Sequence, residues 1–183
     1  MLAPTARAGI IDGNPVREDI DEAGELIGID FIFNVLLDEE KRIIRAVAGH
    51  YLEAHRAGAE AYDRRCDLRI PEAADVVIAS PGGRPKDINL YQSSKTLINA
   101  YQAVKEGGTL VFLSECREGG GPAAFFDWSR YQQAGTLDAE LRRKFTIAGY
   151  IFYVCCEIAA HTNLQMLSTI PADTLESLGF HGH

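Results

Sequence analysis

The sequence predicts an α/β fold: a three-layer, Rossmann-like domain with a mostly parallel central sheet, helices on both faces, and an N-terminal β-hairpin. Residues 75–116 read as an apolar run, a helical pattern and a second apolar run, which is typical of parallel strands joined by a right-handed crossover. A further strand is expected at 163–169. The hairpin is predicted by apolar runs at 30–37 and 42–48, which flank a short polar turn.

The first helix is expected to begin at Pro15 and to end at Gly28. Asn14 can cap it, because an amide side chain accepts from the free N–H groups of a first turn, and proline suits the first helical position. A second helix is expected from about residue 50 to residue 62. Asn34 is polar within an apolar strand, and we interpret it as a core amide rather than a site residue, since most buried polar groups are structural.

A third helix is expected from about Ile88 to Glu106, ended by Gly107-Gly108. Its apolar residues recur at the spacing of one helical face, with Ile98 at the margin of the stripe. They are Leu90, Leu97, Ile98, Tyr101 and Val104. We expect this face to pack on the sheet.

The other side of that helix carries Tyr91, Gln92 and Lys95 within its first turns. Residues three and four apart are neighbours on a helix, so these side chains should form one polar patch. The patch lies near the carboxyl end of the first parallel strand, where open α/β sheets bind ligands. We therefore expect a carboxylate to meet Lys95, Gln92 and the backbone N–H groups of the helix N-terminus, in a crevice that another segment closes. The alternative is a solvated polar face.

Two glycine-rich loops follow predicted strands, at Gly82-Gly83 and at Gly119–Gly121. Neither belongs to a nucleotide fingerprint, because the chain has no GxGxxG at a strand–helix junction and no GxxxxGK[ST]. Three predicted strands end in serine, at Ser80, Ser114 and Ser168. Because the strands are parallel, we interpret these serines as a marker of one sheet edge and not as a catalytic set.

Composition limits the function. The chain has 183 residues, which suits a single domain over 1–183, and a formal net charge of −8. That charge argues against general binding to nucleic acid or to an anionic membrane. No apolar run is long enough to span a bilayer and no signal peptide is evident, so a reducing cytoplasm is the expected compartment. An anionic ligand would need local cations, and Arg84, Lys86 and Lys95 are the candidates.

Cysteine and histidine positions predict no metal site. The four cysteines form no CxxC pair, and His50 and His55 are five residues apart, which does not place them on one helical face. The pair at 155–156 lies in an apolar helical pattern and is expected to be buried. Cys116 has no base paired with it in the sequence, which disfavours a nucleophile. The aromatic residues at 125–131 are expected to pack in the core, with a lid as the alternative.

Several strings of residues resemble the C-terminal part of the nickel-dependent lactate racemase family. The most specific is the string from Gly82 to Lys95, GGRPKDINLYQSSK, and the likeness runs in order from Ala8 to Ser168. Shorter matches are GNPV at 13–16, GIDF at 28–31 and NV at 34–35.

This resemblance implies racemisation or epimerisation of a small 2-hydroxy acid by hydride transfer to a nickel-pincer nucleotide. It implies that Gln92 and Lys95 are catalytic residues that contact the substrate or the cofactor. Tyr91 lies beside them. The residues expected to bind the substrate or the cofactor are Gly82, Gly83, Lys86 and Tyr91.

The family's cofactor-tethering lysine, its paired catalytic histidines and its nickel ligand are not assigned in this chain. We therefore expect a C-terminal-domain fragment of a longer two-domain enzyme, or a stand-alone relative, that is inactive alone and has a cofactor-bearing N-terminal domain as its partner. A homodimer is left open, because a truncated domain face can expose apolar surface. The alternative function is a non-catalytic α/β module that binds a small anion or a nucleotide.

Overall fold

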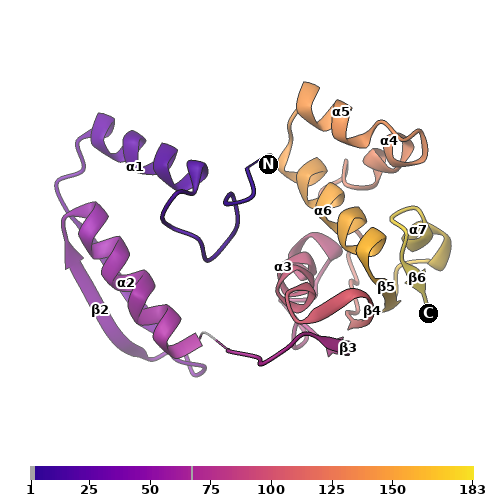
Figure 1. The fold of residues 1–183 in the computed structure, drawn as a ribbon, viewed down its shortest axis with the longest axis horizontal. Helices are drawn as coiled ribbons and strands as arrows, with labels where there is room; N and C mark the ends of the chain where they lie inside the picture. The colour runs from indigo at the N-terminus through magenta and orange to yellow at the C-terminus, as the bar shows by residue number, and fades with distance from the viewer. Residues whose placement is uncertain (1–2, 67) are drawn as a thin grey trace. The chain divides into compact units, whose positions relative to one another are not determined.

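The computed structural model describes residues 3–66 and 68–183, and it separates the chain into two compact units (Figure 1). The first extends to Arg69 and the second runs from Ile70 to His183. Each is described by itself.

The first helix, α1 (Pro15–Ile27), begins and ends as the sequence predicts. The Asn14 side chain accepts from the Val16 N–H at 3.0 Å, and proline occupies the first turn. Gly28 follows the helix with a φ of 72°, a left-handed conformation that glycine adopts without steric cost. Both predicted termini are confirmed.

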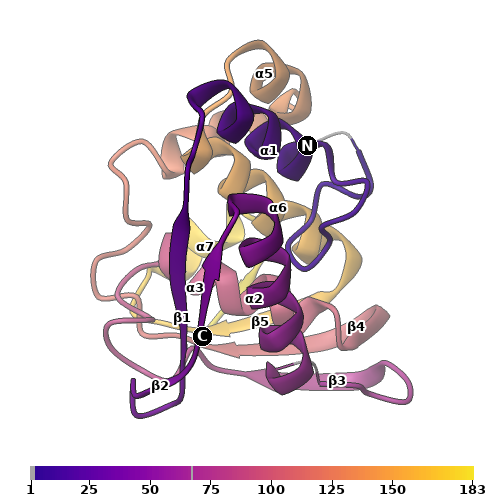
Figure 2. The same ribbon diagram turned by 90° about the vertical axis from the view of Figure 1, so that its left-hand side faces the viewer.

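The predicted hairpin is also confirmed. Strands β1 (Ile32–Leu37) and β2 (Ile43–Gly49) are antiparallel, in a register that pairs Ile32 with Gly49. Helix α2 (Tyr51–Cys66) packs on the hairpin (Figure 2), and Val47 is buried in this unit. One helix on two strands makes a small core, since both strands are edge strands.

The interpretation of Asn34 as a core amide is wrong. Asn34 is exposed, and its side-chain oxygen accepts from the Val35 N–H at 2.8 Å. It stands opposite the buried Val47, but it reaches solvent because a two-stranded sheet has no interior strand. A position in the middle of an apolar run was therefore not an interior position of the fold.

A polar cluster ties α1 to α2. The Asp21 carboxylate accepts from Arg56 at 2.6 Å and also from Arg17, while the Tyr51 hydroxyl donates to the Asp21 carbonyl oxygen at 3.1 Å. Arg17 Nη1 lies 3.3 Å from Nε2 of the half-buried His55. Burial, reinforced by the two guanidinium groups, lowers the pKa of His55 from its ordinary value of 6.5.

His55 and His161 should therefore titrate on opposite sides of pH 6.5. Glu106, 2.6 Å from His161 Nδ1, raises the pKa of that exposed imidazole by hydrogen bonding and charge. As pH falls below 6.5, the unfolded chain protonates His55 before the native state does, so this residue destabilises the fold. The contribution of His161 is present below 6.5 and is lost as pH rises through its raised pKa. An NMR titration of the imidazole signals checks both directions, and coinciding midpoints would contradict them.

The second unit is built on a four-stranded parallel sheet of order β3-β4-β5-β6. Its strands are β3 (Ala74–Ala79), β4 (Val104–Leu113), β5 (Asn163–Leu167) and β6 (His181–Gly182). The predicted α/β class, with a parallel sheet flanked by helices and a separate hairpin, is confirmed. The sequence analysis did not include β6 or the short helix α7 (Ala172–Glu176) that precedes it.

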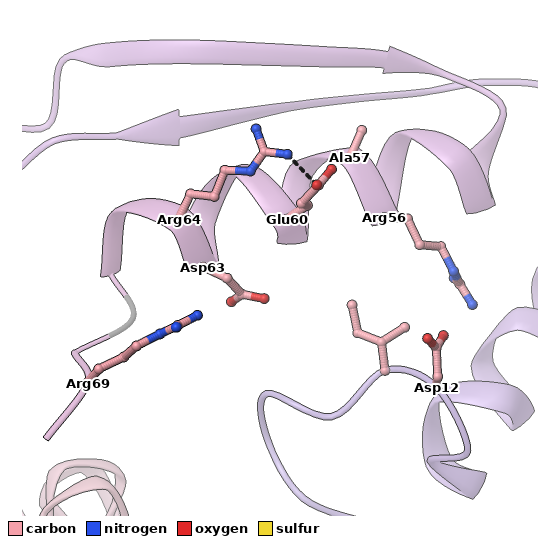
Figure 3. Close-up of a pocket in the computed structure, with 8 residues that line it drawn as sticks. Asp12, Arg56, Ala57, Glu60, Asp63, Arg64 and Arg69 are labelled. Atoms are coloured by element: carbon pink, nitrogen blue, oxygen red, sulfur yellow. Dashed lines mark hydrogen bonds and ion pairs between the residues drawn. The ribbon is translucent and has the colours of Figure 1, made fainter. Parts of the chain in front are cut away.

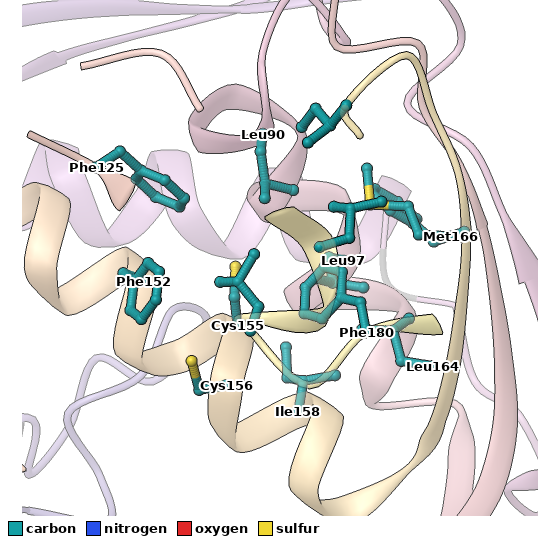
Figure 4. Close-up of a cluster of buried hydrophobic side chains, with 14 of the residues drawn as sticks. Leu90, Leu97, Phe125, Phe152, Cys155, Cys156, Ile158, Leu164, Met166 and Phe180 are labelled. Atoms are coloured by element: carbon teal, nitrogen blue, oxygen red, sulfur yellow. The ribbon is translucent and has the colours of Figure 1, made fainter. Parts of the chain in front are cut away.

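Helices α3 (Leu90–Tyr101) and α6 (Ile147–His161) both pack on one face of this sheet. Alternate strand residues are buried in the same core, among them Leu110 and Phe112 of β4. Leu164 and Met166 of β5 lie in this core as well (Figure 4). The opposite face carries Val76 and Ile78, which are 57% and 70% exposed. The sequence predicts helices on both faces of the sheet. In the described part of this unit, α3 and α6 cover one face, and the face with Val76 and Ile78 is exposed.

The predicted end of the third helix is wrong. Helix α3 stops at Tyr101, and β4 already begins at Val104, so Gly107-Gly108 lies inside a strand. The register explains this: Ala74 pairs with Val104, but Val76 pairs with Thr109, so extra residues bulge out of β4. Gly107 has a φ of 71°, which suits glycine at a bulge rather than at a helix end.

The aromatic segment packs in the core, as expected. It forms a 3₁₀ turn, η1 (Phe126–Trp128), which runs into α4 (Ser129–Gln133); α5 (Leu137–Arg143) follows. Phe125 is fully buried, with its ring 5.6 Å from that of Phe152. The thiols at 155–156 are buried too, and burial raises the pKa of Cys156 to about 12.

Gly149→Ala should destabilise the second unit, although alanine favours helices. A Cβ at this position would clash with Cε2 and Cζ2 of Trp128, because it would lie closer to them than real contacts allow. Overpacking costs about 1–3 kcal/mol, against about 1 kcal/mol gained in helix propensity. Urea unfolding measures the net effect. A second variant, Trp128→Phe, should lower the cost of Gly149→Ala, and equal costs in both backgrounds would contradict the clash.

Candidate functional site

Helix α3 starts at the carboxyl end of the parallel sheet. Asn89 caps it, with its side-chain oxygen accepting from the Gln92 N–H at 2.9 Å. The first turn is also bonded to the loop after β4, since Leu90 N donates to the Gly119 carbonyl oxygen at 2.8 Å. Because that loop leaves the carboxyl end of β4, the start of α3 lies at the sheet edge where the sequence places the site.

Gln92 and Lys95 form one polar pair on this helix, as their spacing predicts. Lys95 Nζ donates to Gln92 Oε1 at 2.8 Å, the ammonium-bearing side chain is exposed, and Gln92 is half-buried. Tyr91 was expected on the same polar side, and that expectation is wrong in part. Tyr91 is half-buried and packs against the hydrophobic core of the unit. The polar contact on this side of the helix is thus that between Gln92 and Lys95, and the binding role of Tyr91 stays a prediction.

The expectation that backbone N–H groups of α3 share an anion is also wrong. Leu90 N and Tyr91 N donate to the carbonyl oxygens of Gly119 and Gly120, at 2.8 and 3.2 Å. The next N–H is taken by the Asn89 side chain. An anion at this end must therefore be bound by side chains, while the partial charge of the helix acts only at a distance.

The other predicted binding residues lie in the loop between β3 and α3. Gly82 and Gly83 have φ values of 85° and 79°, and a Cβ on either would meet no atom within 4 Å. Glycine is required there by backbone conformation and not by crowding. Lys86 is exposed in the same loop, and its N–H donates to the Gly83 carbonyl oxygen at 3.0 Å. The structure places these residues on the loop beside the start of α3.

The three serines at strand ends have different surroundings. Ser80 accepts from the Gly82 N–H at 3.2 Å, and Ser168 donates to the Glu115 carbonyl oxygen at 3.1 Å. Ser114 is buried, and its hydroxyl lies 2.7 Å from that of Ser93. They do mark one sheet edge, because β3, β4 and β5 are adjacent and parallel.

Ser93 is a residue that the sequence analysis missed. It is fully buried on α3, as is its neighbour Ser94. Both lie three or four residues from Leu90 and from Leu97, which are the two fully buried apolar residues of that helix. The helical spacing that predicted the apolar stripe therefore also contained the signal for these hydroxyls.

The described cavities lie away from the Gln92–Lys95 pair. One, of about 530 Å³, lies within the first unit (Figure 3) and is lined by three acidic and three basic residues together with two apolar ones. They are Ile11, Asp12, Arg56, Ala57, Glu60, Asp63, Arg64 and Arg69. A second, of about 400 Å³, lies between residues 132–133 and 173–179. The crevice at Lys95, closed by another segment, thus stays a prediction.

Within residues 3–66 and 68–183, no group of three or more histidine, cysteine or acidic side chains is arranged to hold a metal ion. Among the helices of that same part, none combines the length and the apolar character needed to cross a membrane.

Comparison with known proteins decides the family. Residues 70–145 match the family described as the lactate racemase C-terminal domain, and this segment contains the whole string from Gly82 to Lys95. The chain carries a lactate racemase C-terminal domain. The resemblance seen in the sequence is confirmed, and the chain is a member of a family of racemases, which are isomerases.

Two curated lactate racemases are similar to the chain outside this segment as well. The protein of Thermoanaerobacterium thermosaccharolyticum is 37% identical over 125 residues, and that of Lactiplantibacillus plantarum is 34% identical over 124. Each alignment covers 68% of this chain but 29% of the relative. The aligned part of the chain therefore spans less than a third of the length of these lactate racemases.

A solved structure supports the same family. The lactate racemase apoprotein from Thermoanaerobacterium thermosaccharolyticum superposes with a TM-score of 0.85 at 27% identity. The superposition covers 98% of this chain and 44% of that one, so it includes the hairpin unit as well as the lactate racemase C-terminal domain.

Proposed function

We propose that this chain is the substrate- and cofactor-positioning part of a 2-hydroxy acid racemase or epimerase. The observation that most supports this proposal is the hydrogen-bonded pair of Gln92 and Lys95. The pair lies on the first turns of α3, inside the segment that matches the lactate racemase C-terminal domain. The similarity to curated lactate racemases supports the same reaction class.

The pair suits a substrate that carries a carboxylate next to a hydroxyl. A charge-assisted hydrogen bond from the Lys95 ammonium stabilises a bound carboxylate by about 1.5–3 kcal/mol. Gln92 Oε1 already accepts from Lys95 Nζ, which leaves the Gln92 amide N–H groups to donate to a substrate oxygen. Two donors on a rigid helix orient the substrate α-carbon, which lowers the entropic cost of reaction.

The proposed cofactor is a nickel-pincer nucleotide carried by another part of a longer protein. The chemistry that this cofactor would supply when bound is acceptance of a hydride from the substrate α-carbon. We assign the nickel ligands to that other part, since no cluster of three or more possible metal ligands lies among the residues that the structure describes. Lys86 is exposed, in the same loop as Gly82 and Gly83, which both have positive φ angles. Its ammonium group suits a contact with an anionic group of the cofactor or the substrate.

The same proposal includes partner and compartment. The partner is an N-terminal, cofactor-bearing domain whose surface would complete the crevice at Lys95. We place the protein in the cytoplasm, an assignment supported by its four cysteines, all of which are free thiols.

The proposal is tested by incubating the complete enzyme with one enantiomer of a 2-hydroxy acid labelled with deuterium at the α-carbon. We expect the opposite enantiomer to form with the deuterium retained, because a transferred hydride does not exchange with water. The 183-residue chain alone, as the control, should not racemise the substrate. Loss of deuterium to solvent would contradict hydride transfer, and activity of the isolated chain would contradict a positioning role.

A further inference from the structure

A buried polar cluster joins the start of α3 to the carboxyl end of β4. Ser93, Ser114 and Cys116 are each 3% exposed or less. The two hydroxyl oxygens lie 2.7 Å apart, and Cys116 Sγ lies 3.1 Å from the Ser114 oxygen and 3.7 Å from the Ser93 oxygen. These three residues are named the serine–cysteine cluster.

The hydrogen bonds of the cluster run in one direction. Ser93 donates its single proton to the Asn89 carbonyl oxygen at 3.0 Å, so it can only accept from Ser114. Ser114 then has no proton left for the thiol and accepts from Cys116. The chain of donors thus starts at the loop after β4 and ends at Asn89, the residue that caps α3.

Backbone hydrogen bonds reinforce this connection on both sides. Cys116 N donates to the Asp87 carbonyl oxygen at 3.0 Å, and Glu118 N donates to that of Ile88 at 2.9 Å. Cys116 has a φ of 54°, a left-handed value uncommon outside glycine. The loop conformation is thus held by the same contacts that hold the start of α3.

We infer that the serine–cysteine cluster sets the position of the first turn of α3, and with it the placement of Gln92 and Lys95 relative to a substrate. The three residues are positioning residues, because their side-chain hydrogen bonds run among themselves and from Ser93 to Asn89, and none of those described goes to Gln92 or Lys95. The inference rests on the proposed function, since it concerns a substrate bound by that pair.

The test compares Ser93→Ala, Ser114→Ala and the double variant in the complete enzyme, with Ser94→Ala as the matched control. Ser94 is equally buried on the same helix, but its hydroxyl donates within the helix to the Tyr91 carbonyl oxygen, at 2.8 Å. Ser93→Ala leaves the buried Ser114 hydroxyl without its acceptor, whereas in Ser114→Ala and in the double variant the group that loses its nearest acceptor is the Cys116 thiol, a weaker donor. Stability should therefore fall in Ser93→Ala and recover in part in the double variant.

Two readouts separate positioning from stability. In the double variant we expect hydrogen exchange at the Leu90 and Tyr91 amides to accelerate about tenfold, because their bonds to the loop loosen. We expect kcat to fall about tenfold while KM changes less, because misplaced groups orient the substrate poorly. The Ser94→Ala control should retain wild-type values for both readouts.

Unchanged exchange at these amides in the double variant would overturn the inference. So would a kcat that recovers together with the thermal midpoint, since that would show a purely structural role. A wild-type protein without racemase activity would instead refute the proposed function, and the exchange measurement would then still decide whether the cluster anchors α3.

Discussion

Replacing Lys95 with alanine should lower kcat/KM of the complete enzyme about 10- to 100-fold, because one charge-assisted hydrogen bond to the substrate carboxylate is lost. Lys95 is exposed and its only hydrogen bond among the described residues is to Gln92, so the fold should be unaffected. Chiral chromatography of the product from a single enantiomer measures the rate, and the thermal midpoint checks folding.

Lys105→Ala is the matched control for this variant. Lys105 is also partly exposed and pairs with a carboxylate, that of Asp75 at 2.7 Å, but it lies at the amino end of β4, away from the start of α3. Its removal should change kcat/KM by less than about twofold, since exposed ion pairs contribute little. Equal losses in the two variants would show a general effect of charge and would contradict a specific contact from Lys95.

Phe112→Ala should destabilise the second unit by about 3–5 kcal/mol, the usual cost of a cavity left by a buried phenylalanine. Phe112 is fully buried in β4, a central strand, between Ala79 on β3 and Met166 on β5. Since whole domains are stable by only about 5–15 kcal/mol, this loss should be plain in urea unfolding. Trp128 is the single tryptophan of the chain and reports on this unit by its fluorescence.

The control for Phe112 is Ile78→Ala, on the opposite face of the same sheet. Ile78 is 70% exposed, so its truncation should change stability by less than about 0.5 kcal/mol. A larger cost would show that the second face of the sheet is covered in solution. A small cost for Phe112→Ala would contradict the central position of its side chain in the core.

Much of the fold follows from local patterns in the sequence. The cap at Asn14, the stop at Gly28 and the antiparallel hairpin are each decided by short-range chemistry, and the structure confirms them. The meeting of Gln92 with Lys95 is equally local, because residues three apart on a helix are neighbours whatever the rest of the chain does.

Other features depend on partners distant in the sequence. Asn34 is exposed because its sheet has two strands, which the residues around it do not reveal. The local spacing of apolar residues predicts a helix at Val104, but Val104 begins strand β4, because its pairing with Ala74 outweighs the local pattern. The occupied N–H groups of α3 could not be predicted, since their acceptors at Gly119 and Gly120 come from a separate loop.

By itself, the sequence determined the α/β class, the family likeness and the adjacency of the amide and the ammonium group on one helix. Only the tertiary structure decided where α3 ends, which of its polar groups remain available to a ligand, and how Ser93 joins it to the end of β4. The physical reason is range. Helix spacing and capping act over a few residues, whereas the satisfaction of buried donors depends on groups that only the folded chain brings together.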